Sequence, residues 1–272
     1  MTGVDALLVV ELLALGSITG FLAGLLGVGG GMMMVPFMTL ILGARGVESG
    51  LAVKMAIATS MATILFTSLS SVRAHHARGA VRWDLLRSLA PGIVCGGLFS
   101  GAGLFASLRG QGLALFFAAF VGLSGLQMLL DRKPAPSRQM PGPVGQGAVG
   151  AAIGLVSGLV GAGGAFLSVP FMIWCNVPVR QAVGTSAALG FPIALANTLG
   201  YIVAGWSVEP PLPGAAGYLY LPALAVIAMA SMSMAPLGAR MTHRLDVARL
   251  KRLFAFLLFG LAATMAAKGL GA

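Results

Sequence analysis

Two glycine-rich stretches hold the residues of this chain that are best suited to bind a ligand through the backbone. GLLGVGGGMMMVPFM spans residues 24–38 and GLVGAGGAFLSVPFM spans residues 158–172, with nine of fifteen positions identical and no gap. Glycine lets a ligand approach the backbone closely, and a helix that begins after the glycines presents free N–H groups and the positive end of its dipole. The pair therefore predicts an anion site. The predicted contact residues are Gly27, Gly29, Gly30, Gly31, Gly161, Gly163 and Gly164.

A hydroxyl pair follows each glycine stretch by about twenty residues. AIATS (56–60) contains Thr59 and Ser60, and AVGTS (182–186) contains Thr185 and Ser186 at the same positions, 126 residues later. Hydroxyls there could donate hydrogen bonds to an oxyanion. The alternative is that they bond back to the preceding helical turn, as Ser and Thr often do in apolar helices.

Four further polar residues stand out against the apolar sequence. Asn197 is an amide inside a predicted helix and needs a partner, either the substrate or another helix. Lys54 and Arg180 also match at a spacing of 126 residues, so they could recruit an anion at two opposite mouths or simply extend toward the lipid headgroups from helix ends. Glu11 could carry a coupling proton, although the second half has Gly145 in its place.

Other reactive residue types do not form recognisable sites. Cys95 and Cys175 lie far apart in apolar segments and are expected to pack, not to pair. His75 and His76 lie in a basic loop without an acid or cysteine cluster, so no metal and no cofactor is expected. The GLSG around Ser124 resembles the serine of an intramembrane protease, but a nucleophilic serine needs a base within reach and none is predicted. An enzyme is therefore not expected.

The elements that must position these residues are membrane helices. Hydrophobic residues make up 58% of the chain and charged residues 9%, against about 25% charged in an average soluble domain. Most of the charge-free stretches can supply the ~20 apolar residues of a spanning helix, so the predicted class is an all-α polytopic membrane protein with about eight transmembrane helices. These stretches are 12–44, 55–72, 88–108, 110–130, 139–179, 181–208, 210–239 and 253–267.

The two glycine stretches fall in the two segments that are too long for one crossing, of 33 and 41 residues. Irregular backbone at membrane depth must be buried in protein or line a wet cavity, so both breaks are expected to face inward. Pro36 and Pro170 suit the first turn of a new helix. The helix could begin near Gly31, but the extended geometry of a residue before proline favours a start at Pro36. A further alternative is that the glycines only allow close helix packing.

Charge distribution predicts the topology. Of the basic residues, 13 fall in loops that we assign to the cytoplasm and four (Arg45, Lys54, Arg109 and Lys268) outside. The formal charge of +10 thus reflects topology, and nucleic acid is not an expected partner. To keep each loop on its side, each broken segment must leave and return at one side, as a hairpin or re-entrant pair. The N-terminus is then external, and no removable signal peptide is predicted.

The same topology predicts two inverted repeats. RAHHARGAVRW (73–83) is basic and cytoplasmic, whereas its counterpart GWSVEPPLPG (205–214) has no basic residue and is external. We bound the first repeat at 1–130, a cytoplasmic linker at 131–143 and the second repeat at 144–272. The linker has four prolines and is expected to join the halves without packing demands of its own. Inverted repeats with broken helices are typical of secondary transporters.

Residues 20–38 and 154–172, each followed by AIATS or AVGTS, resemble the sulfite exporter TauE/SafE family of membrane transporters. The resemblance spans the chain. It implies export or uptake of small sulfur-containing anions such as sulfite or organosulfonates. Together with the broken repeats, it predicts a secondary transporter that works as an exporter across the inner membrane. A coupling proton or sodium ion would drive it, since the first stretch lacks the G-K-[ST] of a phosphate-binding loop. An anion channel is the main alternative, and an intramembrane hydrolase a remote one.

Overall fold

The structure, a computed structural model, describes residues 5–26, 30–130, 135, 137–241 and 247–271. Within those residues, eight helices are long and apolar enough to cross a membrane, and the only strands are a two-residue pair. The predicted all-α polytopic membrane fold is therefore confirmed. The elements are α1 (Ala6–Leu26), α2 (Gly31–Ala44), α3 (Ser49–His76), α4 (Trp83–Leu98), η1 (Phe99–Leu104), α5 (Phe105–Ser107), α6 (Gly110–Leu130), α7 (Pro143–Val160), α8 (Ala165–Trp174), α9 (Val179–Ala204), β1 (Ala215–Ala216), β2 (Leu219–Tyr220), α10 (Leu221–Met241) and α11 (Val247–Leu270).

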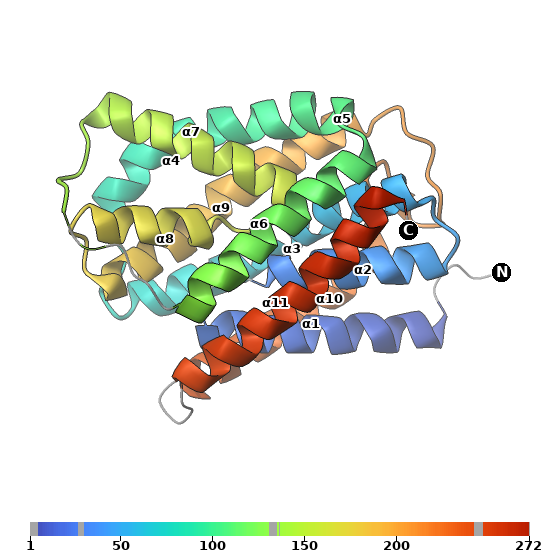
Figure 1. The fold of residues 1–272 in the computed structure, drawn as a ribbon, viewed down its shortest axis with the longest axis horizontal. Helices are drawn as coiled ribbons and strands as arrows, with labels where there is room; N and C mark the ends of the chain where they lie inside the picture. Colours follow the sequence, from blue (N-terminus) through green and yellow to red (C-terminus); the bar gives the residue numbers. More distant parts are fainter. Residues whose placement is uncertain (1–4, 27–29, 131–134, 136, 242–246, 272) are drawn as a thin grey trace.

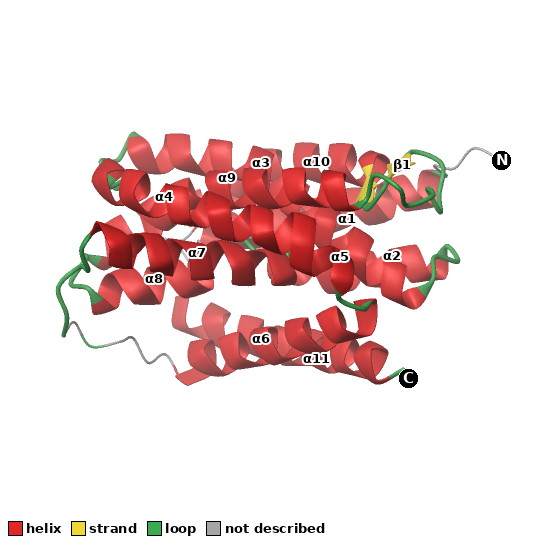
Figure 2. Cartoon of the chain, turned by 90° about the horizontal axis from the view of Figure 1, so that it is seen from above, coloured by secondary structure: helices red, strands yellow, loops and turns green. Residues whose placement is uncertain are grey.

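The helices lie along the long axis of the molecule, with the two ends of the chain at the same end of the bundle (Figure 1). The connection between α6 and α7 lies at the opposite end. Figure 2 shows α6 and α11 side by side as a layer on one face of the bundle. The order of elements after the linker repeats the order before it, with η1 and α5 continuing α4 as one span over 83–107.

Polar caps fix where the apolar helices begin. The Asp5 carboxylate accepts a hydrogen bond from Leu8 N at 2.9 Å, and that bond, with Arg45 beside it, holds the pKa of Asp5 below its usual value. The Glu48 carboxylate accepts from Gly50 N and Leu51 N, both at 2.9 Å, at the start of α3. Such acceptors satisfy the free N–H groups of a first helical turn.

Each broken segment leaves and returns at one end of the bundle, as the charge distribution predicts. Arg45, just after α2, lies 3.0 Å from the carboxylate of Asp5, just before α1. In the second half, Arg138 N, before α7, donates to the carbonyl of Trp174 at the end of α8. With a rise of 1.5 Å per residue, the ten residues of α8 cover about 15 Å, half of a hydrocarbon core of ~30 Å. Helix α8 is therefore too short to cross a membrane.

Glycines within α1 and α4 bring helices from the two halves into close contact. On α1, Gly16, Gly20 and Gly24 face α10, and an ideal Cβ on Gly24 would lie 2.0 Å from Ala235 O. On α4, a Cβ on Gly96 would lie 2.0 Å from Ala151 O of α7. Small residues at four-residue spacing allow such crossings in membranes. The packing alternative thus explains these glycines, which lie within the helices and not in the interrupted backbone.

The helix pairs show that the two halves point in opposite directions. Gly16, Gly20 and Gly24 meet residues 227–235 in the same order, so α1 runs parallel to α10, and α7 is likewise parallel to α4. The end of the α4 span meets the start of α10, because the rings of Phe105 and Tyr218 have centroids 5.5 Å apart. Helices α1 and α7 therefore run in opposite senses, and α2 and α8 extend toward opposite ends of the bundle (Figure 1).

Both short helices begin earlier than the proline rule favours. Helix α2 starts at Gly31 and α8 at Ala165, so that Pro36 and Pro170 each lie inside a helix as its sixth residue. The preference for a start at Pro36 is wrong, because packing of the apolar face of α2 overrides the local bias of Val35: residues Met32, Val35 and Met38 are fully buried.

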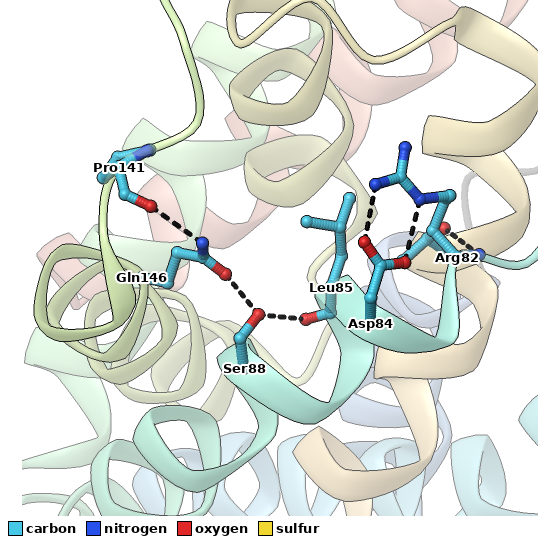
Figure 3. Close-up of polar contacts among 7 residues, drawn as sticks. Arg82, Asp84, Leu85, Ser88, Pro141 and Gln146 are labelled. Carbon is cyan, nitrogen blue, oxygen red and sulfur yellow. Dashed lines mark hydrogen bonds and ion pairs between the residues drawn. The ribbon is translucent and has the colours of Figure 1, made fainter.

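The linker has packing contacts, contrary to expectation. Trp174 Nε1 donates to Ser137 Oγ at 2.9 Å, and the Arg138 guanidinium lies 4.6 Å from the Trp174 ring centroid. Figure 3 shows the next part: Gln146 Nε2 donates to Pro141 O at 2.7 Å, and the same amide contacts the Ser88 hydroxyl of α4. The linker is thus attached to α8 and, through α7, to α4.

Candidate functional site

The second break is a short loop shaped by two glycines. Helix α7 ends at Val160, Gly161 has φ +70° and Gly164 has φ +74°, and α8 begins at the next residue. Left-handed backbone of this kind favours glycine and is a common end for a helix. In the first break, Gly30 directly precedes α2, whereas the predicted contacts Gly27 and Gly29 lie outside the described residues.

The two breaks contact each other, although 130 residues separate them in sequence. An ideal Cβ on Gly31 would lie 2.4 Å from Gly161 O and 3.2 Å from Ala162 Cα, so the two backbones touch. Ser60 of α3 donates to Gly161 O at 3.2 Å. The structure therefore brings the predicted residues Gly31, Ser60 and Gly161 together inside the bundle.

Within the described residues, both short helices begin with backbone N–H groups that have no acceptor. Met33 N and Met34 N donate to Gly30 O, and Leu167 N and Ser168 N donate to Gly164 O. Across the described ranges, no hydrogen bond forms from the N–H groups of residues 31–32 or 163–166. Such groups at helix N-termini attract an anion, and each would be costly to leave unpaired inside a membrane. Anion binding is thus what this arrangement can do chemically.

The two threonines at equivalent positions of the repeat accept hydrogen bonds from residues just before other helices. Thr59 Oγ1 accepts from Tyr220 N at 3.1 Å, just before α10, and Thr185 Oγ1 accepts from Arg82 N at 3.0 Å, just before α4. Both threonines are fully buried. In the part of the chain that the structure describes, neither hydroxyl proton is donated to an acceptor, so donation to an anion stays a prediction.

The adjacent serines contact the broken segments instead. Ser60 bonds to the loop carbonyl of Gly161, and Ser186 accepts from Ser168 Oγ of α8 at 2.8 Å. In each Thr-Ser pair, the threonine therefore holds the start of a helix and the serine holds a break or its short helix.

The Asn197 side chain lies against α7, at a part of that helix several residues before the second break. Its Nδ2 donates to Gly154 O at 3.2 Å and to Ile193 O at 2.9 Å. Because both acceptors are carbonyls, the amide orientation is fixed and both amide hydrogens are used. Only its oxygen remains, so this side chain cannot donate to an anion.

The predicted recruiting cations lie away from the breaks. Lys54 Nζ donates to Ala106 O at 3.1 Å and lies 5.8 Å from the ring of Phe105 and 5.5 Å from that of Tyr218. Arg180 donates to the carbonyl of Arg78, at the other end of the bundle. Each cation therefore interacts with a carbonyl at a helix end.

Glu11 is not isolated in the structure. Its carboxylate lies 3.6 Å from the Arg45 guanidinium, which also pairs with Asp5. The acid predicted to carry a coupling proton is thus part of an ion-pair cluster near the start of α1.

Ile64 is a contact that sequence reasoning missed. Its Cδ1 would lie 3.3 Å from a Cβ on Gly31, and its Cγ2 3.6 Å from a Cβ on Gly163, so it packs against both breaks. One isoleucine in an apolar helix carries no signal of its own. Its position four residues after Ser60, on the same helical face, could have indicated it.

Three expectations about other residues have clear outcomes. Ser124 Oγ donates to Phe120 O at 2.8 Å, the ordinary back-bond of a helical serine, and so resembles no nucleophile. Cys175 is buried as expected, but Cys95 is exposed on α4, so the packing prediction is wrong for it. His75 and His76 form the last turn of α3, where a loop was predicted.

Comparisons with known proteins relate this chain to membrane proteins. The family model described as "Sulfite exporter TauE/SafE" matches residues 12–265. A "Probable membrane transporter protein" of Haemophilus influenzae is 35% identical over 260 residues, which cover 93% of this chain and 96% of that protein. The "Probable membrane transporter protein YdhB" of Bacillus subtilis is 27% identical over 69% of this chain and 76% of its own length. No solved structure matches the chain.

The family match covers almost the whole chain and includes both breaks and both Thr-Ser pairs. The matches indicate a membrane transporter and not an enzyme. The chain belongs to the sulfite exporter TauE/SafE family of membrane proteins.

Proposed function

We propose that this protein is a secondary transporter that exports small sulfur-containing anions, such as sulfite or organosulfonates, across the inner membrane. The description of its family supports the substrate class, and the names of its relatives support transport. The absence of a G-K-[ST] phosphate-binding motif in the glycine stretches supports an ion gradient, not ATP, as the energy source.

One observation carries the proposal: two broken helices from opposite halves meet, and within the described residues their helix ends leave N–H groups without acceptors. An ideal Cβ on Gly31 would lie 2.4 Å from Gly161 O, and the N–H groups of residues 163–166 form no bond within the described chain. Sulfite has three oxygens on one face and can accept several N–H bonds at once. Two helix dipoles that approach from opposite directions would favour such a charge.

The neighbours of the breaks are neutral, which suits release as well as binding. Ser60, Ile64, Ser168 and Gly190 surround the described parts of the breaks, and none of them carries a charge. Backbone dipoles without a fixed cation hold an anion less tightly than an arginine pair does. We therefore propose that the broken loops and the serines Ser60 and Ser186 contact the substrate during transport.

We also propose that the N-terminus is external and that Lys54 and Arg180 recruit the anionic substrate. The assignment of 13 basic residues to one side and four to the other supports this orientation. In it, Lys54 lies near the external face and Arg180 near the cytoplasmic face. A cation at each mouth would raise the local concentration of an anionic substrate.

The test is transport in proteoliposomes with radiolabelled sulfite or a radiolabelled sulfonate. We expect saturable flux and counterflow, in which unlabelled sulfite on one side drives labelled sulfite across from the other. Flux that does not saturate and appears as a single-channel current would contradict a transporter. If no tested sulfur anion crosses the membrane, the proposed substrate class is contradicted.

A further inference from the structure

A cluster of buried side-chain oxygens without hydrogen-bond partners lies between α7, η1 and α9. It is separate from the N–H groups of the breaks. Within the described residues, the Ser100, Ser157 and Asn197 side-chain oxygens have no partner, and each of these residues is at most 2% exposed. Buried polar atoms without a partner are rare and point to a ligand.

Gly158 shows how close two of these atoms are. An ideal Cβ on Gly158 would lie 1.9 Å from Asn197 Oδ1 and 2.5 Å from Ser100 Oγ, so both oxygens point at one spot on α7. At other glycines of the helix crossings, such as Gly24 and Gly154, an added Cβ would meet the backbone of another helix. Gly158 instead leaves room for two polar side chains.

The chemistry of these atoms selects a cation and not an anion. Asn197 Nδ2 is committed to two carbonyls, so its free atom is an amide oxygen with lone pairs only. Ser100 supplies a second neutral oxygen from η1, a π-helical turn of a kind that is frequent at functional sites. Hard cations prefer such oxygen ligands, and carbonyl-type oxygens coordinate Na⁺ in the broken helices of transporters.

The cluster adjoins the second break. Ser157 Oγ would lie 3.1 Å from a Cβ on Gly164, the residue before α8, and Ser157 O accepts from Gly161 N and Ala162 N. A positive charge beside Gly158 would therefore lie next to the second break, which contains the N–H groups of residues 163–166. Opposite charges so close would favour each other's binding.

We propose that Asn197 Oδ1 and Ser100 Oγ are ligands of a sodium ion at Gly158. We further propose that the protein binds this ion and the anion at the same time, a step that rests on the function proposed above. Linkage then requires that Na⁺ raise the affinity for the anion by the same factor by which the anion raises the affinity for Na⁺.

The first experiment measures thermal unfolding of the purified protein without any sulfur anion, in sodium, potassium or choline chloride at equal ionic strength. Na⁺ bound to the folded state should raise the melting temperature above that in the other two salts. Ser100→Ala should lose this sodium-dependent increment and keep its melting temperature in choline chloride, because Ser100 Oγ bonds to no described residue.

Ser231→Ala is the matched control, since Ser231 is also buried (1%) but its hydroxyl donates to Ala228 O. It should keep the increment. Ser100→Cys replaces the hard oxygen by sulfur at similar size and serves in place of Ser100→Ala if that variant does not fold. Equal melting in the three salts, as a bound water would give, overturns the site, and so does an increment that survives in Ser100→Ala and Ser100→Cys.

A second measurement separates this inference from the transport proposal. Sulfite affinity should be about tenfold higher in sodium than in potassium chloride, a typical coupling between sites. Equal sulfite affinity in both salts would overturn sodium coupling and leave anion transport standing. A sodium-dependent melting increment without any anion binding would support the cation site and contradict the transport proposal.

Discussion

The hydrogen bond between Thr185 and the start of α4 allows a quantitative test of how the repeat motif works. Thr185 is fully buried, and its Oγ1 accepts from Arg82 N at 3.0 Å. Thr185→Val keeps the shape of the side chain but removes this acceptor. A hydrogen bond contributes about 1 kcal/mol net, and a buried donor left without a partner costs up to about 3 kcal/mol. Because Arg82 is only half-buried, we expect a loss of about 1 to 2 kcal/mol in the free energy of unfolding.

The assay is unfolding of the purified protein in detergent by titration with sodium dodecyl sulfate, followed by circular dichroism. Thr63→Val is the control, because Thr63 is also fully buried but its hydroxyl donates only to Thr59 O within α3. Removing such a back-bond should change stability by less than about 0.5 kcal/mol. If the two variants are equally stable, the hydrogen bond between Thr185 of α9 and the start of α4 does not contribute to the free energy of unfolding as we expect.

Three further predictions follow from the packing and the charges. Gly96→Val should destabilise the protein by about 3 kcal/mol or more, because an added Cβ would lie 2.0 Å from Ala151 O. Gly103→Val is the control and should not destabilise it, because nothing lies within 4 Å of a Cβ there. Equal melting temperatures of the two variants would contradict the close crossing of α4 and α7. In a background without native cysteines, Glu209→Cys should react with an impermeant reagent added outside and Ala77→Cys only after permeabilisation; labelling of both from one side would contradict the inverted topology. Arg180→Gln should slow anion flux more at low than at high ionic strength, and a salt-independent effect would argue against recruitment.

The sequence was sufficient to predict the membrane helices and the positions of their interruptions. Long charge-free runs, glycine and proline are local signals, and backbone that cannot be satisfied by lipid leaves few alternatives to helices. The start of α2 was harder to predict, since the extended preference before Pro36 is weak against burial of Met32 and Val35. Docking of Ser137 onto Trp174 depends on contacts between segments far apart in the chain.

The sequence predicted only part of the candidate site, because the rest also depends on contacts between segments far apart in the chain. Repetition indicated Gly31, Gly161 and Ser60, which the structure brings together. The different roles of threonine and serine within one motif could not be read from spacing, because neighbouring residues on a helix face directions about 100° apart. Which atom of Asn197 remains free depends on carbonyls of α7, which no local pattern specifies.

The central claim is that backbone N–H groups of the breaks bind the anion, and calorimetric titration of sulfite into wild type and Gly163→Val tests it most directly. Gly163 suits the test because a Cβ there makes an ordinary contact, 3.6 Å from Ile64 Cγ2, while the valine methyl groups cover the loop. We predict saturable binding by wild type and a loss of about tenfold or more in the variant, equivalent to one hydrogen bond to a charged group, with little change in melting temperature. Gly112→Val, where nothing lies within 4 Å, should bind as wild type does. Wild-type protein that binds no sulfur anion, or a folded Gly163→Val variant that binds sulfite with unchanged affinity, would contradict the account.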